Sequence, residues 1–223
     1  MKTITILLAD DHTIVREGFR KMLELESGFE IVGEASNGRE AVALAAKLRP
    51  AVVLMDIAMP LLNGLESTRQ ILKGLPATRV LILSAHSDSA YVQSAVDSGA
   101  AGFLLKQTSA HEVCRAIREI NAGKTFYSPA VAKQLNHQKS VGRDGLPNKQ
   151  AVQLTSREME VLQLIAEGKA NKETASELGI AIKTVEKHRE HLMQKLNIHD
   201  TAGLTRYAIS AGIIESSVQL TIV

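Results

Sequence analysis

Residues 3–12, TITILLADDH, decide the fold class. The stretch begins as a run of β-branched and aliphatic residues, typical of a buried strand, and ends abruptly at two adjacent carboxylates, Asp10 and Asp11. Two like charges side by side repel each other, so we expect a positive partner close to them. A second apolar run, AVVLMD at 51–56, also ends on an acid, Asp56. Both runs therefore predict strands whose ends carry acidic side chains.

The first half of the chain alternates between strand-like and helix-like patterns. Apolar runs predict strands over 3–9, 29–35, 51–55, 79–83 and 101–105. Amphipathic patterns predict helices over 13–25, 38–48, 64–73, 89–98 and 110–121. Such alternation is typical of a parallel sheet covered by helices on both faces. We therefore predict an α/β fold with a five-stranded, flavodoxin-like parallel sheet in the order 2-1-3-4-5.

The character of the sequence changes after residue 127. Residues 128–153 combine Gly, Pro, Asn and Gln with four Lys/Arg against one Asp, which predicts a short helix that passes into a flexible linker. From Leu154 on, strand patterns disappear and four helices are expected, the first of them capped by Thr155 or Ser156. The expected organisation is an α/β domain over 1–127, a linker over 128–150 and a small all-α domain over 151–223.

Composition narrows the class of protein. The chain has 223 residues and a net charge of +2, so any binding to nucleic acid must come from a local patch. Its one cysteine, Cys114, excludes an internal disulfide and fits a reducing compartment. The N-terminus lacks a small-residue cleavage site, and no apolar run is long enough to span a bilayer. We expect a cytoplasmic protein without a membrane partner.

Polar residues stand at the ends of four predicted strands. Asp10 and Asp11 end the first strand and Asp56 ends the third. Ser84 and Lys106 end the fourth and the fifth. In open α/β sheets the ligand site lies at the carboxyl ends of the strands, so these residues are expected to share one crevice. Three carboxylates suit a hard divalent cation, Mg²⁺, which prefers oxygen ligands.

A cation beside the carboxylates lets a phosphoryl group approach them. Asp56 is then expected to act as a nucleophile and form an acyl phosphate. Lys106 supplies positive charge and Ser84 a hydroxyl donor for the phosphoryl oxygens. Any one of these residues alone is more simply a solvated loop residue, but five such residues at the ends of four strands favour a common site.

The motifs ADDH, LMDIAMPLLNG, LSAH and GFLLK resemble the receiver domain of bacterial two-component response regulators over about residues 1–125. The resemblance implies the following roles: Asp56 as phosphoacceptor, Asp11 as direct Mg²⁺ ligand, Asp10 acting through water, the carbonyl of Ala58 as third protein ligand, Ser84 and Phe103 as a switch pair, and Lys106 as phosphoryl contact. Gln107 stands where many receivers have proline, and Phe103 stands for the frequent tyrosine. A plain core role for Phe103 stays open.

The C-terminal helices form the pattern of a helix-turn-helix. On the helix expected over 182–196, the predicted core face carries Ile182, Val185, Leu192 and Leu196. Cationic or ionisable residues recur every four positions on another face: Lys183, Lys187, His191 and Lys195. Such a ridge suits the DNA backbone, although an ordinary solvated face explains it equally well. Residues 151–223 carry eight Lys/Arg against nine Asp/Glu, so we expect modest non-specific affinity.

The motifs LTSREMEVLQLIAEG, NKETASELGI and KTVEKHREHLMQKL resemble the helix-turn-helix domain of the LuxR/NarL class. The resemblance implies DNA contacts at Asn171, Lys172, Lys183, Thr184, Glu186, Lys187, Glu190 and Lys195. The acidic Glu186 and Glu190 are unusual there. They either accept from cytosine N4 or pair with Arg189 or Lys187. The helix expected over 200–211 is used for dimerisation in this class, which implies a homodimer that reads an inverted repeat. The resemblance to this class gives no role for the tail 215–223.

Together these features predict a transcriptional regulator that accepts a phosphoryl group on Asp56 from a sensor histidine kinase. Phosphorylation then changes dimerisation and binding to promoter DNA. The alternative is a DNA-binding regulator whose activity is largely independent of phosphorylation. An enzyme of the Asp-nucleophile phosphohydrolase type is not expected, because those enzymes usually carry a second Asp two residues on, where this chain has Ala58.

Overall fold

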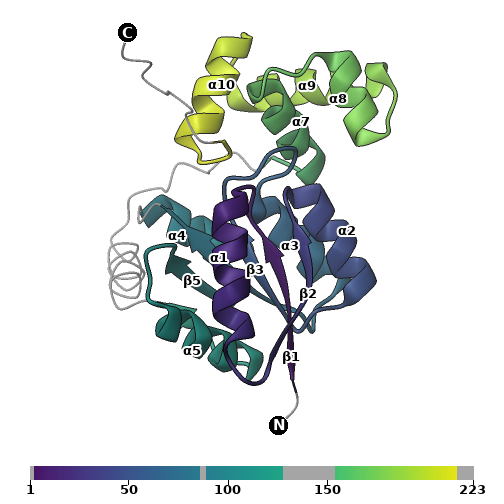
Figure 1. Cartoon of the computed structure of the whole chain (residues 1–223). Helices are drawn as coiled ribbons and strands as arrows, with labels where there is room; N and C mark the ends of the chain where they lie inside the picture. Colours follow the sequence, from purple (N-terminus) through teal and green to yellow (C-terminus); the bar gives the residue numbers. More distant parts are fainter. Residues whose placement is uncertain (1–2, 86–88, 128–153, 215–223) are drawn as a thin grey trace, which may run out of the picture. The chain divides into compact units, whose positions relative to one another are not determined.

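The structure is a computed structural model that describes residues 3–85, 89–127 and 154–214. The chain divides into two compact units, Met1–Ala151 and Val152–Val223. Figure 1 shows the elements of both units. The expected short helix after residue 127, the linker and the tail at 215–223 lie outside the described residues.

The first unit is built on a fully parallel sheet with the strand order β2-β1-β3-β4-β5-β6. The strands are β1 (Ile4–Ala9), β2 (Phe29–Ala35), β3 (Val52–Asp56), β4 (Arg79–Ser84), β5 (Gly102–Leu105) and β6 (Phe126–Tyr127). The predicted fold class and the order 2-1-3-4-5 are confirmed. The predicted number of five strands is wrong, because β6 has only two residues and is too short to leave a periodic pattern.

A glycine lets β6 lie against β5. A Cβ atom added to Gly102 would lie 2.5 Å from the carbonyl oxygen of Phe126 and 2.8 Å from a methyl group of Leu81. Both distances are shorter than van der Waals contact, so only glycine allows this close approach at the edge of the sheet.

Helices cover both faces of the sheet. They are α1 (Thr13–Glu24), α2 (Gly38–Leu48), α3 (Gly64–Gly74), α4 (Ser89–Asp97) and α5 (Ala110–Asn121). Each begins and ends within one residue of the predicted range. Three of them have side-chain N-caps, since Asn37, Asn63 and Ser109 each accept a hydrogen bond from a backbone N–H in the first turn.

Two hydrophobic cores lie on opposite faces of the sheet. Residues of α2, α3 and α4 pack with one set of strand side chains, and residues of α1 and α5, including buried Cys114, pack with the other. Figure 1 shows these helices on both sides of the strands. All five residues of β3 are buried, as a strand covered on both faces requires. Polar side chains of the central strands can therefore reach solvent only at the strand ends.

The second unit is helical. It contains α7 (Ser156–Ala166), α8 (Asn171–Leu178), α9 (Ile182–Leu196) and α10 (Thr201–Ser210). α7 contacts the other three helices and supplies most of the core through Val161, Leu162, Leu164 and Ile165. Leu204 and Ala208 of α10 are also buried, and α10 packs against α7.

The turn between α8 and α9 has helix-turn-helix character. Gly179 ends α8 with φ 63° and ψ 34°, the left-handed conformation that glycine adopts at least cost. The core face predicted for α9 is correct for Val185 and Leu192 but wrong for Ile182, which is 42% exposed. Ile182 is the first residue of the helix, and Val185, one turn further on, fills the core position. Among the described helices, none is long and apolar enough to cross a bilayer.

Candidate functional site

An acidic cluster lies at the carboxyl end of the sheet. Asp10 and Asp11 follow β1 directly, and Asp56 is the last residue of β3, the strand paired with β1. One ligand atom from each of Asp10, Asp11, Asp56 and His12 lies within 4.8 Å of the others. Residues separated by more than forty positions in the sequence thus meet because their strands are neighbours, as the strand order predicts.

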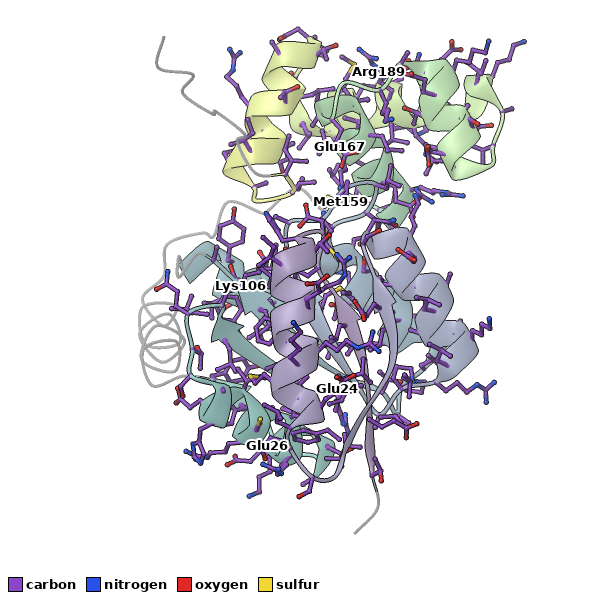
Figure 2. The ribbon with its side chains drawn as sticks, viewed as in Figure 1. Glu24, Glu26, Lys106, Met159, Glu167 and Arg189 are labelled. Carbon is purple, nitrogen blue, oxygen red and sulfur yellow. The ribbon has the colours of Figure 1, made fainter. Side chains whose placement is uncertain are left out.

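Lys106, the residue directly after β5, joins this cluster. Its Nζ atom lies 2.8 Å from Oδ2 of Asp10 and 2.9 Å from Oδ2 of Asp56. In Figure 2, Lys106 lies at the opposite end of the first unit from Glu26, which follows the C-terminal end of α1. The three side chains are largely buried, so their charges interact more strongly than they would in water.

The charges of the cluster do not balance. Burial and the neighbouring carboxylate of Asp10 raise the pKa of Asp56 to about 7, although Lys106 acts in the opposite direction. Burial would lower the pKa of Lys106, but the charge of Asp56 and hydrogen bonds to Asp10 and Asp56 raise it. The ammonium of Lys106 contacts two of the three carboxylates, those of Asp10 and Asp56, and one positive charge cannot neutralise all three. The excess negative charge and the all-oxygen carboxylate set fit a hard divalent cation.

The backbone around Asp56 holds one carboxylate oxygen and leaves the other available. The backbone N–H of Ile57 donates to Oδ1 of Asp56 at 2.9 Å, whereas Oδ2 faces Lys106. The following loop, which contains Ala58, is closed by a 2.8 Å hydrogen bond from the N–H of Gly64 to the carbonyl of Ile57. A Cβ atom on Gly64 would lie 1.8 Å from the carbonyl oxygen of Asp56, so this loop requires glycine.

The expected switch pair lies on the strands next to Asp56. Ser84 is buried at the end of β4, and its carbonyl accepts from the N–H of Lys106 at 2.8 Å. Phe103 is fully buried on β5 within the core that includes Val92 of α4. In this state Phe103 is a core residue, and its role in a switch stays a prediction. The peptide bond that joins Lys106 to Gln107 is trans.

Two residues that contact the acidic cluster were not predicted from the sequence as part of the site. Arg16 of α1 donates from Nη1 to the carbonyl of Asp10 at 2.7 Å, and its Nε lies 3.4 Å from Oε2 of Glu34. His12 faces the carboxylates of Asp10 and Asp11. The signal for His12 was visible in ADDH, because the imidazole directly follows the two acids. Arg16 left no such signal, since one of its partners is a backbone carbonyl and the other, Glu34, lies on another element, β2.

The second unit displays the expected DNA-contacting residues unequally. On α9 the following are exposed: Lys183, Thr184, Glu186, Lys187 and Glu190. At the start of α8, Lys172 is exposed and Asn171 is half-buried. These positions lie on the two helices of the helix-turn-helix, and their contacts with DNA stay a prediction.

Lys195 differs from the other lysines of α9. Its Nζ donates to Oε2 of Glu158 at 2.6 Å, and the same oxygen accepts from the N–H of Thr155. Although burial of Glu158 acts in the opposite direction, the hydrogen bonds from Lys195 and Thr155 hold the pKa of Glu158 below its usual range. The charge of Lys195 is therefore engaged within the protein, between α9 and the N-terminus of α7.

Arg189 links three helices of this unit and is labelled in Figure 2. It donates to Oδ1 of Asn171 at 3.3 Å and to Oγ1 of Thr201 at 2.8 Å. Glu190 instead accepts from the side chain of Gln194 at 3.3 Å. The alternative in which Glu186 or Glu190 pairs with Arg189 or Lys187 is not observed among the described residues.

Comparison with known families and proteins agrees with both units. Residues 6–118 match the response regulator receiver domain, and residues 152–208 match the family described as bacterial regulatory proteins, luxR family. The chain belongs to the response regulator family. This response regulator is 40% identical to the transcriptional regulatory protein LiaR of Bacillus subtilis over 92% of its own length and 96% of LiaR.

Two further relatives have narrower or more distant similarity. The transcriptional regulatory protein MctR of Rhizobium johnstonii is 41% identical, but the match spans 60% of this chain and 59% of MctR. A structure of RcsB from Salmonella enterica serovar Typhimurium has a TM-score of 0.59 and 26% identity, and covers 92% of this chain and 98% of RcsB. The response regulator therefore shares a receiver domain and a LuxR-type DNA-binding domain with relatives over nearly its full length.

Proposed function

We propose that this response regulator is a phosphorylation-dependent, DNA-binding transcriptional regulator that accepts a phosphoryl group on Asp56 from a sensor histidine kinase. The observation that carries the proposal is the position of Asp56 Oδ2, which lies 2.9 Å from Lys106 Nζ within a cluster of carboxylates at the end of the sheet. We expect the protein in the cytoplasm, as its single cysteine indicates.

The reaction transfers the phosphoryl group from nitrogen to oxygen. A carboxylate oxygen of Asp56 attacks phosphorus while the bond to the imidazole nitrogen of the kinase histidine breaks, and the bonding electron pair stays on that nitrogen. The side chain of Asp56 must be ionised to attack, and Lys106 favours ionisation. Lys106 is also close enough to donate to phosphoryl oxygens once the acyl phosphate has formed.

We expect Mg²⁺ to be required for this transfer. Asp10, Asp11 and Asp56 would hold it with the carbonyl of Ala58, and their oxygen atoms suit its preference. When bound, the ion supplies positive charge that offsets the carboxylates and the incoming phosphoryl oxygens. Arg16 fixes the backbone of Asp10 through its carbonyl, so the acidic loop is held before any ion binds.

Phosphorylation is expected to reach the DNA-binding unit through the surface around β5. A phosphoryl group on Asp56 would draw the hydroxyl of Ser84 toward it and free space for the ring of Phe103. The remodelled surface would favour a homodimer, and a two-fold dimer reads an inverted repeat in promoter DNA. The similar RcsB structure was obtained bound to promoter rprA in the presence of the phosphomimetic BeF₃⁻.

DNA contacts are proposed for the exposed cations and hydroxyl at the start of α9, Lys183, Thr184 and Lys187, with Lys172 and Asn171 of α8 at the backbone. Glu186 and Glu190 are exposed on the same helix, where a carboxylate can accept from cytosine N4. Lys195 is the weakest of the expected contacts, because its ammonium already binds Glu158.

The test is DNA affinity and oligomer size with and without BeF₃⁻ and Mg²⁺. Wild type is expected to bind promoter DNA more tightly and to form dimers in the presence of the phosphomimetic. Asp56→Asn should respond in neither assay, whereas Glu17→Gln, at an exposed position of α1, should respond as wild type does. Equal DNA affinity of wild type with and without the phosphomimetic would favour the alternative, a regulator largely independent of phosphorylation.

A further inference from the structure

We propose that His12 is a nitrogen ligand of the cation site and makes this receiver favour a transition-metal ion such as Mn²⁺ more than an all-oxygen site would. The inference rests on the proposed function, because it concerns the same cation. It adds a residue that the acidic motif alone does not include.

The imidazole of His12 already lies among the carboxylates. Its Nδ1 atom is 2.7 Å from Oδ1 of Asp11 and 3.3 Å from Oδ1 of Asp10. A ring nitrogen of His12 is also among the four ligand atoms, one from each of Asp10, Asp11, His12 and Asp56, that lie within 4.8 Å of one another. These separations are close enough for the atoms to bind one ion with small side-chain movements.

The backbone holds His12 in this place. Its N–H donates to Oδ1 of Asp10 at 2.8 Å, and its carbonyl accepts from the N–H of Arg16 at 3.0 Å in the first turn of α1. The residue is therefore fixed on one side by the acidic loop and on the other by the helix.

The ring has no structural task that would explain this orientation. His12 is the N-cap residue of α1, but its side chain makes no capping hydrogen bond. The side chain is 60% exposed, so it does not fill a core either. Among the described residues, the ring contacts the carboxylates of Asp10 and Asp11, which are themselves expected to face the cation.

The chemistry of the donor set leads to a specific preference. Lys106 approaches the Oδ2 atoms of Asp10 and Asp56, whereas His12 approaches the Oδ1 atoms of Asp10 and Asp11. Imidazole nitrogen binds first-row transition ions well, but Mg²⁺ prefers oxygen and gains little from nitrogen. A histidine in the set therefore raises the affinity for Mn²⁺ more than the affinity for Mg²⁺.

Electron paramagnetic resonance on the full-length protein tests the proposal directly. Mn²⁺ added to wild type should give a bound ion whose electron spin echo is modulated by one ¹⁴N nucleus of a coordinated imidazole. In His12→Gln this modulation should disappear, and Mn²⁺ affinity should fall by roughly tenfold. Mg²⁺ affinity, measured by competition, should change by less than about twofold. His111→Gln, an exposed histidine on α5, is the matched control and should behave as wild type.

The outcomes separate the two proposals. Bound Mn²⁺ without ¹⁴N modulation in wild type, or with the same modulation in His12→Gln, overturns the role of His12 and leaves the acidic site standing. Mn²⁺ that does not bind, or that binds equally well to Asp11→Asn, overturns the proposed cation site and His12 with it. The effect of BeF₃⁻ on DNA binding tests the proposed function independently of these measurements with Mn²⁺.

Discussion

The acidic cluster of the first unit and the α9 surface of the second differ in how their residues are brought together. Asp10, Asp56 and Lys106 come from three strands and meet at one edge of the sheet, where each is within hydrogen-bond distance of another. The residues of α9 lie along one helix, and most of them are exposed and separate. In the first region the strand order determines which side chains contact one another. On α9 the contacts of each side chain depend on its own length and on the neighbouring helices.

This difference determines what sequence can predict. Strand order places the cluster, so roles assigned from strand ends bring the right residues together. On α9 the regular spacing of Lys183, Lys187 and Lys195 suggests three equal cations, yet only Lys195 is bound to a buried carboxylate. A helical wheel shows the direction in which a side chain points, but it does not show which residue of another helix that side chain contacts.

The substitution with the largest expected effect disrupts the loop next to the acidic cluster of the first unit. Gly64→Ala would place a Cβ atom 1.8 Å from the carbonyl oxygen of Asp56, so the loop after β3 must shift. We expect a loss of about 3 kcal/mol in the free energy of unfolding, and no response to BeF₃⁻. Urea unfolding measures the first effect and size-exclusion chromatography the second.

Gly74→Ala is the matched control, because a Cβ atom there would meet nothing within 4 Å. It is expected to change stability by less than about 0.5 kcal/mol. Equal effects of the two substitutions would show that the loop does not depend on close contact with Asp56.

A second prediction uses the raised pKa of Asp56, about 7, against an ordinary value near 4. Between these values the unfolded chain is ionised while the folded carboxyl keeps its proton, so ionisation favours unfolding increasingly as pH rises toward 7. With a metal chelator present, wild type should lose stability relative to Asp56→Asn between pH 4.5 and 7.5, on the order of 1–3 kcal/mol.

Urea unfolding of both proteins at several pH values checks this sign. The difference should level off above about pH 8, where the folded carboxyl is also ionised. A wild type that gains stability relative to Asp56→Asn over this range would mean that Lys106 outweighs burial and the charge of Asp10.

The smallest expected effect sharpens the contrast between two lysines of α9. Lys195→Ala leaves the buried carboxylate of Glu158 without its ammonium partner and should cost about 1–2 kcal/mol of stability. Lys187→Ala should change stability by less than about 0.5 kcal/mol, but it should weaken DNA binding and reduce the salt dependence by about one ion. Thermal unfolding and salt titrations of DNA binding separate the two. Equal stability of both variants would contradict the structural role of Lys195.

Most of the first unit was predictable because its signals are long and repeated. Buried strands of four to seven residues and capped helices leave clear patterns, and their ends agree with prediction to one residue. β6 was not predictable, since two residues have no period and depend on the close approach that Gly102 allows. The exposure of Ile182 was also not predicted. A helical wheel places Ile182 on the core face, but Ile182 is the first residue of α9, so no preceding helical turn covers its side chain.

The same reason explains which residues of the two sites could be predicted from the sequence. Asp10, Asp11, Asp56 and Lys106 were recognised by their places at strand ends, which topology then unites. The contact of Arg16 with the Asp10 carbonyl and that of Lys195 with Glu158 depend on side-chain reach across elements, which no pattern records. His12 directly follows the acids in the sequence, but it was not predicted as a site residue, because carboxylates alone already suit Mg²⁺.

The central claim is that Asp56 is the residue that receives a phosphoryl group. The most direct measurement incubates the protein with Mg²⁺ and a small-molecule phosphoryl donor, reduces the acyl phosphate with borohydride, and locates the product by peptide mass spectrometry. The account predicts homoserine at position 56 in wild type and none in Asp56→Asn. Homoserine at another aspartate of wild type, or an unchanged position 56 in protein that has gained the mass of a phosphoryl group, would contradict it.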